Sequence, residues 1–285
     1  MSSTAETTDR DAPTPDENVI KSVLSSDTAR LWWWRLAFGA AVLVFWELTS
    51  GRLYSSFWFS KPSAIAQSLY ESFTSGQLIS DVAITLRAAV LGYGFGAVLG
   101  VVLGFVIAEL RTVAKVLNPY ILAVYGIPRI ALAPLFIVWF GIGITSKIML
   151  AALMTFFLTF FNTFTGVGQI DDDLVNVARV LDAGRLTILR KVVLPAASPW
   201  IIAGLRIAIP YAIVAAIVGE FIASTAGLGF RIMQSTQLFN TTGTLAGILV
   251  IMVLVMIFNL ILDRLESYLL RWQPSSERPG GGTQS

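Results

Sequence analysis

Residues 171–195 read DDDLVNVARVLDAGRLTILRKVVLP and interrupt two long apolar stretches with a run of polar side chains. Charged side chains are costly in the hydrocarbon core of a membrane, so this segment lies outside it. A short helix-turn-helix at such a place can dock in a groove of a partner protein. The alternative is an ordinary basic loop whose arginines only help to set the orientation of the chain.

The composition around this segment is that of an integral membrane protein. Of the 285 residues, 55% are hydrophobic and only 13% are charged, whereas a soluble domain carries far more charge. The net charge of +2 argues against a nucleic-acid partner. Cysteine and histidine are both missing, which excludes disulfides, a thiolate nucleophile and histidine-based metal sites. We therefore expect no metal site and no catalytic residue.

The apolar stretches predict an all-α integral membrane fold with six transmembrane helices. A helix needs roughly 20 apolar residues to cross the bilayer core. Six stretches meet this length, at about 32–49, 82–109, 118–140, 147–168, 198–221 and 243–262. They form a six-span domain at 30–272, between polar segments at 1–29 and 273–285 that predict disordered tails. The segments 60–78 and 227–239 predict short amphipathic helices at the membrane surface.

The distribution of Lys and Arg predicts the orientation, because short cytoplasmic loops are enriched in these residues. With the N-terminus inside, ten cations flank the spans on the inside and four on the outside. Both termini and the 171–195 loop are then cytoplasmic. The inside set is Arg30, Arg35, Arg111, Lys115, Arg179, Arg185, Arg190, Lys191, Arg264 and Arg271, and the outside set is Arg52, Lys61, Lys147 and Arg231.

Glycines recur at every fourth position of the second span, at Gly92, Gly96, Gly100 and Gly104. Small residues at this spacing let helix backbones approach closely. Four residues turn about 400°, so the stripe drifts about 40° per step around the helix. This drift predicts a steeply crossing neighbour, or several neighbours in turn. The contact is either static packing or a sliding surface between two states.

Polar and proline residues inside the spans are candidates for a translocation pathway. Arg129 lies in the third span between Pro128 and Pro134, each of which removes a backbone hydrogen bond. Its guanidinium could bind an anion with two hydrogen bonds, or it could pair with a carboxylate of a second subunit or reach the membrane surface. Two further candidates are Asn162, a possible cross-link between helices, and Glu220, for which Arg87 is a plausible ion-pair partner.

The spacing of residues 171–195 resembles the cytoplasmic EAA loop of bacterial ABC importer permeases, E-A-A-x3-G-x9-I-x-L-P. Counting back from Leu194 and Pro195 places Val192 in the isoleucine slot and Asp182 in the glycine slot. The three E-A-A slots hold Asn176, Val177 and Ala178. Because Asp182 replaces the glycine, we expect Gly184 to supply the positive φ and to shift the turn.

Further segments are similar to permeases of the nitrate/sulfonate/taurine type, among them IPRIALAPLFIVWFGIG, RKVVLPAASPWIIAGLRIAI and VGEFIASTAGLGFRIM. This resemblance implies a homodimer in the bacterial inner membrane, with two cytoplasmic ABC ATPase subunits docked on the coupling loops. It also implies a periplasmic or lipid-anchored solute-binding protein. ATP would bind the ATPase, so the chain itself needs no cofactor and is no enzyme. The phosphate-binding pattern G-x4-G-K-[ST] does not occur in the sequence.

The resemblance leaves the transported molecule open. A small anion such as a sulfonate, taurine or nitrate is the first hypothesis. A neutral heterocycle such as a pyrimidine or flavin precursor is the second, because this permease type also serves such molecules. An ion-driven secondary transporter or an intramembrane enzyme is a third. The lack of histidine, of paired intramembrane carboxylates and of an inverted repeat argues against it.

Overall fold

The computed structural model describes residues 17–52, 55 and 57–269, and across these ranges the chain is helical without a strand. It divides into two compact units, one ending at Ser63 and one beginning at Ala64. Helix α1, Glu17–Thr49, begins inside the segment predicted to be a disordered N-terminal tail. The predicted C-terminal tail and residues 1–16 lie outside the described residues.

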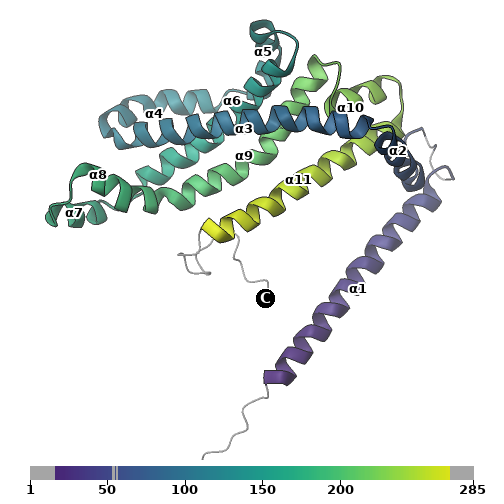
Figure 1. Ribbon diagram of the computed structural model, residues 1–285, viewed down its shortest axis with the longest axis horizontal. Helices are drawn as coiled ribbons and strands as arrows, with labels where there is room; N and C mark the ends of the chain where they lie inside the picture. Colours follow the sequence, from purple (N-terminus) through teal and green to yellow (C-terminus); the bar gives the residue numbers. More distant parts are fainter. Residues whose placement is uncertain (1–16, 53–54, 56, 270–285) are drawn as a thin grey trace, which may run out of the picture. The chain divides into compact units, whose positions relative to one another are not determined.

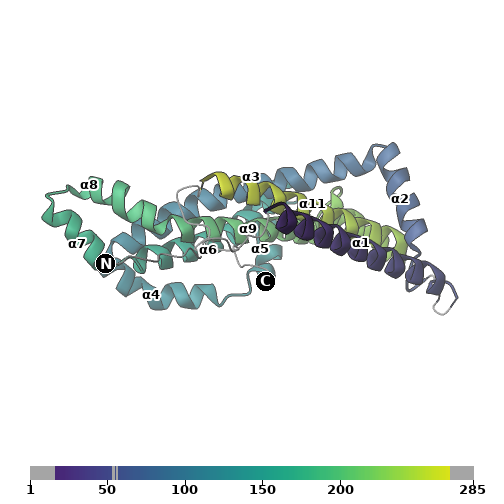
Figure 2. The same cartoon turned by 90° about the horizontal axis from the view of Figure 1, so that it is seen from below.

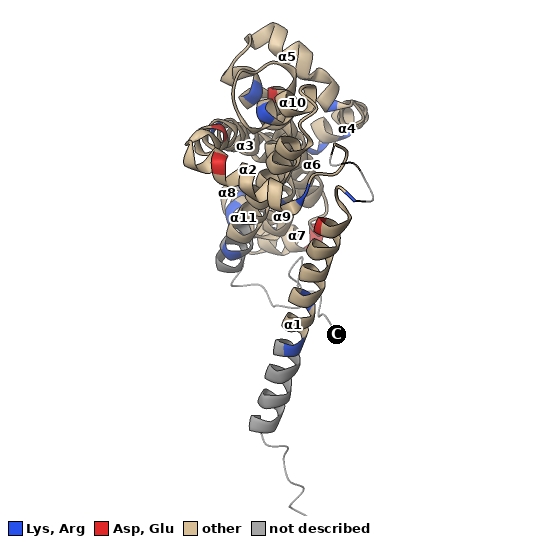
Figure 3. Ribbon diagram, turned by 90° about the vertical axis from the view of Figure 1, so that its right-hand side faces the viewer, with Lys and Arg blue, Asp and Glu red and all other residues tan. Residues whose placement is uncertain are grey.

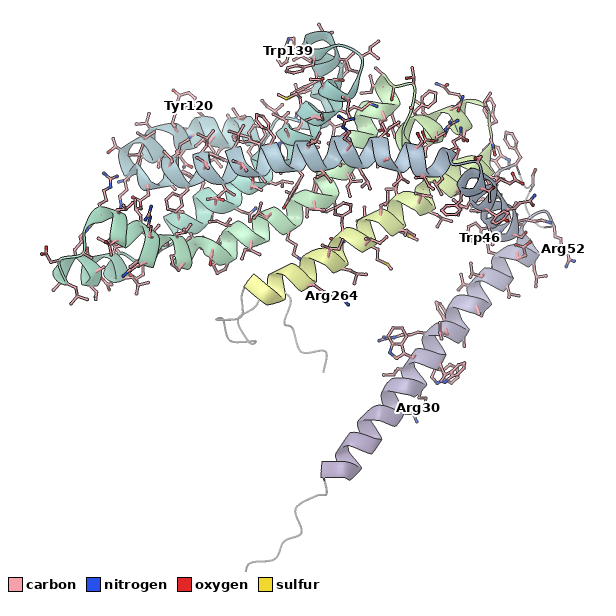
Figure 4. All side chains as sticks on the ribbon, viewed as in Figure 1. Arg30, Trp46, Arg52, Tyr120, Trp139 and Arg264 are labelled. Carbon is pink, nitrogen blue, oxygen red and sulfur yellow. The ribbon has the colours of Figure 1, made fainter. Side chains whose placement is uncertain are left out.

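The first unit consists of the long helix α1 and the segment that follows it. Residues Arg30–Thr49 of α1 are long and apolar enough to cross a membrane, as predicted for 32–49. Figure 4 labels Arg30, Trp46 and Arg52 on this unit. The Glu47 carboxylate accepts hydrogen bonds from the main-chain N–H of Ser63, at 3.0 Å, and from its hydroxyl, at 2.7 Å. These bonds stabilise the first turn of α2, Pro62–Thr74.

The second unit holds the remaining spans (Figure 1). Helices α3, α6 and α9 run lengthwise together, with α7 and α8 at one end and α10 at the other (Figures 1 and 2). The two segments predicted to form short helices do so, as α2 and α10. The bounds are α3 Gln77–Glu109, α4 Arg111–Tyr125, α5 Ala133–Phe140, α6 Ile144–Gly168, α7 Asp172–Val180, α8 Arg185–Ile188, α9 Leu194–Ile222, α10 Leu228–Gln237 and α11 Thr241–Leu269.

Five helices of the described chain are long and apolar enough to cross a membrane, and a bent pair of helices makes a sixth candidate span when the pair is counted as one. The predicted third span at 118–140 is not a single helix. Helix α4 and the segment Arg129–Phe140 meet at an angle of 78°. The chain turns at Gly126, Ile127 and Pro128, because proline disfavours a helical conformation in the residue before it. A 3₁₀ turn, Arg129–Leu132, then leads into α5.

The second proline of this segment has a different effect from the one predicted. Pro134 lies in the first turn of α5, where a main-chain N–H has no partner within the helix. It therefore removes no helical hydrogen bond, and the break is due to Pro128. Pro210 lies inside α9 without ending the helix.

The glycine stripe of α3 packs along a single helix, α6. A methyl group added at Gly92, Gly100 or Gly104 would come within 2.6–2.7 Å of the main-chain oxygens of Ile148, Phe156 and Phe160, respectively. One at Gly96 would overlap the oxygen of Ala152. The prediction of a steep crossing or of several neighbours is thus wrong. Two helices that wrap around each other can follow a drifting stripe over four turns.

The α6 side of this contact carries a matching stripe of threonines. Thr155, Thr159 and Thr163 are fully buried and recur at the same spacing of four residues as the glycines they face. The Thr159 hydroxyl donates to the Thr155 carbonyl at 2.9 Å. We call these residues, together with the four glycines, the glycine–threonine zipper. It brings the backbones of α3 and α6 close together from Gly92 to Gly104.

The two halves of the bent pair differ in burial. In α5, Ala133 and Phe136 belong to an apolar core formed with α6 and α9. By contrast, none of the 15 residues of α4, all of them described, is buried. Tyr120 of α4 and Trp139 of α5 are 67% and 62% exposed, and both project outward in Figure 4. Helix α5 is thus part of the bundle, while α4 lies along its outside.

Candidate functional site

Arg129 lies at the break of the third span and rests on aromatic rings. Its guanidinium carbon is 4.7 Å from the ring centre of Tyr125 and 5.0 Å from that of Phe157. One of its terminal nitrogens donates to the Tyr125 carbonyl at 3.0 Å. Tyr125 also meets Phe161 edge to face, with ring centres 4.2 Å apart. Aromatic faces attract cations, so these rings hold the charged group at a fixed place.

The charge of Arg129 is not neutralised within the described chain. No carboxylate of the described ranges forms an ion pair with it, and its buried Nε has no hydrogen-bond partner there. The predicted alternative of a carboxylate partner from a second subunit stays a prediction. The guanidinium is half-buried and retains hydrogen-bonding capacity.

The other predicted pathway residues do not gather around Arg129. Pro128 directly precedes Arg129 in the chain and Pro134 follows it by five residues, and both prolines are exposed. Asn162 donates to the Leu158 carbonyl of its own helix at 2.8 Å, and its side chain packs against Gly204 of α9. Its side chain thus lies in the contact between α6 and α9, but its hydrogen bond stays within α6, so the structure does not show the predicted cross-link between helices.

Glu220 is the centre of a buried polar cluster at the α10 end of the unit, far along the chain from Arg129. It is 1% exposed, and its carboxylate accepts hydrogen bonds from the Thr85 hydroxyl at 3.0 Å and the Gly229 N–H at 2.8 Å. Its ion-pair partner is Lys147, with Nζ and Oε1 3.7 Å apart. The predicted pair with Arg87 is wrong, because Arg87 is exposed on α3.

The cluster fastens the loop between α9 and α10 to three helices. The Lys147 ammonium donates to the Ser224 hydroxyl at 2.6 Å, and the Leu228 N–H donates to the Thr85 hydroxyl at 2.9 Å. Asp81 accepts from the Gly227 N–H at 2.9 Å and from Arg231 Nε at 2.7 Å. Charged residues occupy few positions along the helices (Figure 3). We call the residues around Glu220 the Glu220 cluster.

At the opposite end, residues 171–195 form the predicted helix-turn-helix. Helix α7 begins after Asp171, whose carboxylate accepts from the Asp173 N–H at 2.9 Å as an N-cap. After the turn, α8 starts at Arg185 and leads through a π-helical turn at Leu189–Val193 into α9. Pro195 lies in the first turn of α9, where its missing N–H costs no bond.

The turn between α7 and α8 is centred on Asp182, not on Gly184. Asp182 has a φ of +56°, whereas Gly184 is extended at −64°. The Ala183 N–H donates to the Ala178 carbonyl at 3.0 Å and the Asp182 N–H to the Arg179 carbonyl at 2.9 Å. This is the Schellman ending of a helix. The predicted shift of the turn is wrong, because aspartate tolerates the left-handed conformation better than most residues.

The coupling loop has an inner face and an exposed face. Ala178 and Ala183 pack on a core of Val167, Ile188 and Val193, so they face the chain itself and not a partner. Val192 is half-buried in the same core, while Asn176 and Leu194 are exposed. Apolar side chains of the exposed face lie in solvent, namely Leu174, Val177, Val180, Leu181 and Leu186 at 53–86% exposure.

An ion pair joins the first turn of α7 to the start of α4. The Arg111 guanidinium faces the Asp172 carboxylate with two nitrogens, one bonded to Oδ1 and the other 3.4 Å from Oδ2. Both side chains are exposed. The Arg111 guanidinium lowers the pKa of Asp172 by hydrogen bonding and by charge attraction. Asp172 also favours α7 because a negative charge near a helix N-terminus is stabilising.

Comparison with known proteins identifies the family. Residues 96–272 match the family described as binding-protein-dependent transport system inner membrane component. The chain is 33% identical to a putative aliphatic sulfonates transport permease protein of Bacillus subtilis, over 86% of this chain and 90% of the relative. It is 33% identical to the riboflavin transport system permease protein of Chloroflexus aurantiacus, over 82% and 88%. For the taurine transport system permease protein of Escherichia coli the identity is 30%, over 80% and 85%.

The fold agrees with that of a solved ABC transporter. The inward-facing MetNI methionine transporter aligns with 67% of this chain and 95% of its own, with a TM-score of 0.55 and 24% identity. The chain therefore belongs to the family of binding-protein-dependent transport system inner membrane components. It is the permease subunit of an ABC importer and a multi-pass protein of the inner membrane.

Sequence reasoning missed two sets of residues in this permease. The threonines Thr155, Thr159 and Thr163 carry the same spacing as the glycines, and that shared spacing could have identified the zipper. The Arg111–Asp172 pair carried no comparable signal, because its two residues are far apart in the sequence and separated by two predicted spans.

Proposed function

We propose that this permease moves a small anion, such as a sulfonate, taurine or nitrate, past Arg129 at the break of the third span. The observation that carries the proposal is a guanidinium within a span that no carboxylate of the described chain neutralises. A charge at this depth costs roughly 2.5–3.5 kcal/mol. Each of the two rings offsets about 0.5–1 kcal/mol at a partly exposed site. A transient anionic ligand would supply the missing counter-charge.

The proposed assembly is a homodimer with two cytoplasmic ATPase subunits and a periplasmic or lipid-anchored solute-binding protein. The exposed apolar side chains of α7 and α8 support docking of the ATPase there, because five such side chains in one short loop call for a partner surface. ATP hydrolysis belongs to that subunit. The Lys and Arg distribution supports a cytoplasmic loop and cytoplasmic termini.

A second candidate substrate is a neutral heterocycle. The relative from Chloroflexus aurantiacus is named for riboflavin transport. The rings of Tyr125, Phe157 and Phe161 beside Arg129 could stack on a planar molecule. In that case the guanidinium would donate hydrogen bonds to ring carbonyl groups, with no need of a net negative charge.

Uptake by the reconstituted complex tests both candidates. The permease, its ATPase and its solute-binding protein are placed in liposomes, and ATP-driven uptake of taurine and of riboflavin is measured. Arg129→Ala should abolish taurine uptake while folded yield and ATPase assembly stay near wild type. Arg87→Ala is the matched control, since Arg87 is an exposed arginine of another span, and it should transport normally.

The outcomes separate the candidates. Loss of taurine uptake in well-folded Arg129→Ala supports the anion hypothesis. A well-folded variant that still takes up taurine at the wild-type rate contradicts it. A variant that fails to fold assigns Arg129 a structural role and contradicts it as well. Uptake of riboflavin but not of taurine by the wild type supports the heterocycle.

A further inference from the structure

Helix α4 is connected to the rest of the permease at its two ends only. At Leu110 a single residue outside helical conformation joins it to α3, with φ −88° and ψ 74°. At the other end Gly126 and Pro128 bound the 78° break. None of the α4 side chains is buried, all of them being described. A helix with so few packing contacts can change its angle at low energetic cost.

The first end of α4 is attached to the coupling loop. Arg111 is the first residue of α4, and its two-pronged bond with Asp172 reaches the first turn of α7. Paired hydrogen bonds between a guanidinium and a carboxylate fix the direction as well as the distance. A displacement of α7 therefore pulls on the start of α4.

The second end of α4 is attached to the Arg129 site. Tyr125 is the last residue of α4, and it supplies both a ring beneath the guanidinium and the carbonyl that accepts its hydrogen bond at 3.0 Å. A rotation of α4 would therefore shift Tyr125 against Phe157, which lies on α6 and holds the other face of the same guanidinium.

The surroundings of α4 form a fixed frame. The glycine–threonine zipper joins α3 to α6 along their length. The Glu220 cluster ties α3, α6 and α9 together at the far end. Helix α5 is held in the core by Phe136. Sliding of α3 along α6 would break these contacts, whereas α4 has no buried residue to lose when its angle changes.

We propose that α4 is a lever that carries movement of the coupling loop to the Arg129 site, with Arg111 as the positioning residue. This inference rests on the proposed docking of an ATPase at α7 and α8. When the ATPase displaces α7, Asp172 draws Arg111 with it, and α4 turns about Leu110. The ring and carbonyl of Tyr125 then move relative to Arg129, which changes the hydrogen-bonding capacity that it offers to a ligand.

A charge exchange tests the lever in the complete reconstituted complex. Arg111→Asp should lower taurine uptake several-fold relative to ATP hydrolysis, and Asp172→Arg should do the same. The double variant restores an ion pair of opposite polarity and should recover most of the uptake. Lys115→Asp, one turn further along α4, is the matched control for a lost positive charge on the same helix, since Lys115 is exposed and its replacement leaves the Arg111–Asp172 pair intact.

Spin labels supply a readout that a purely structural role would leave unchanged. The chain has no native cysteine, so labels are placed at Val116 of α4 and Ile207 of α9, both exposed. An excess of unlabelled chain suppresses distances between subunits. The distance should change between the nucleotide-free and vanadate-trapped complexes, and Arg111→Asp should abolish the change. The pair Val102 and Ile207, on α3 and α9, should stay constant.

Two results would overturn the lever. One is an α4 distance that does not respond to nucleotide in a wild-type complex that transports. The other is an Arg111→Asp variant whose α4 distance and uptake both match the wild type. Failure of the proposed function is distinguishable from failure of the lever. A permease that binds no ATPase, or that takes up neither test substrate, contradicts the proposed function.

Discussion

Lys147 of α6 and Glu220 of α9 lie 3.7 Å apart, Nζ to Oε1, with side chains 5% and 0% exposed. Each is held by further hydrogen bonds, to Ser224 from the lysine and from Thr85 and Gly229 to the glutamate. Two opposite charges that are buried together in this way depend on each other, because neither is hydrated. The pair therefore makes the Glu220 cluster a single unit that is kept or lost as a whole.

Replacement of Glu220 with glutamine should destabilise the permease strongly. It leaves the Lys147 ammonium buried without its counter-charge, at a cost of about 3–5 kcal/mol. Thermal unfolding in detergent measures the loss. The double variant Lys147→Met/Glu220→Gln should regain part of the stability, because no unpaired charge remains. Glu71→Gln on the exposed face of α2 is the control, and equal melting of Glu220→Gln and Glu71→Gln would contradict the prediction.

Alanine scanning of the α3 glycines should separate the zipper from the opposite face of the helix. Gly96→Ala places a methyl group against the Ala152 carbonyl and should cost about 1–3 kcal/mol by overpacking. Gly94→Ala, two residues away, meets no atom within 4 Å and should be neutral or slightly stabilising. The folded fraction of each variant after heating is the measurement. Similar losses for both glycines would show that α3 does not pack on α6 as described.

Substitution at Asp182 should reveal the strain in the turn of the coupling loop. An L-residue in the left-handed conformation carries a penalty of roughly 1–2 kcal/mol, which glycine does not. Asp182→Gly should therefore slow amide exchange in α7, and Asp182→Val should speed it. Gly184→Ala should have little effect, because Gly184 is extended and has free space around it. A large effect at Gly184 with none at Asp182 would contradict the assignment of the left-handed residue of the turn to Asp182.

Single cysteines should be labelled from opposite sides of the membrane at Arg185 and Thr225. Both positions are exposed, and they belong to the two ends of the second unit (Figure 1). In intact cells an impermeant maleimide should modify Thr225→Cys and leave Arg185→Cys unmodified until the membrane is permeabilised. Modification of Arg185→Cys from outside would invert the orientation that the Lys and Arg distribution predicts.

The contact between Arg111 and Asp172 should be lost only in acid. Arg111 lowers the pKa of Asp172 below its ordinary value of 3.8. Because this pKa is lowered, the ion pair stabilises the folded state at pH values above the ordinary pKa. The stabilisation disappears as the pH falls through the lowered pKa. A carbon NMR titration of the Asp172 carboxyl, assigned with Asp172→Asn, should give a midpoint that rises in Arg111→Gln. An unchanged midpoint would show that the two groups do not meet.

Local patterns predicted much of this structure, and contacts between distant segments were the part that escaped prediction. Span lengths and the Pro128 break follow from hydropathy and from backbone sterics, which depend on a few neighbouring residues. The ion-pair partner of Glu220 could not be predicted from such local patterns. Arg87 and Lys147 both lie at the right end of their spans, and only the rotation of each helix decides which one faces the glutamate.

In the candidate site, too, local features were predicted and contacts between distant segments were not. The polar segment up to Pro195 predicted the helix-turn-helix of α7 and α8 correctly, because a short chain segment has few ways to turn. Which residue takes the positive φ was missed, since the preference of glycine over aspartate is small enough for the Schellman bonds at Ala183 to decide. For Arg129 the sequence identified the unusual charge but not the rings of Tyr125 and Phe157 that hold it.

The break at Pro128 separates the segment that carries Arg129 from the helix contacts that stabilise the bundle. Residues 126–131 lie outside the glycine–threonine zipper and outside the Glu220 cluster, so substitutions there leave these two sets of contacts in place. Changes of chemical preference can therefore accumulate there without loss of folding. With the proposed role of Arg129, a change of transported molecule would require new side chains at this bend and no change in the helix contacts of the bundle.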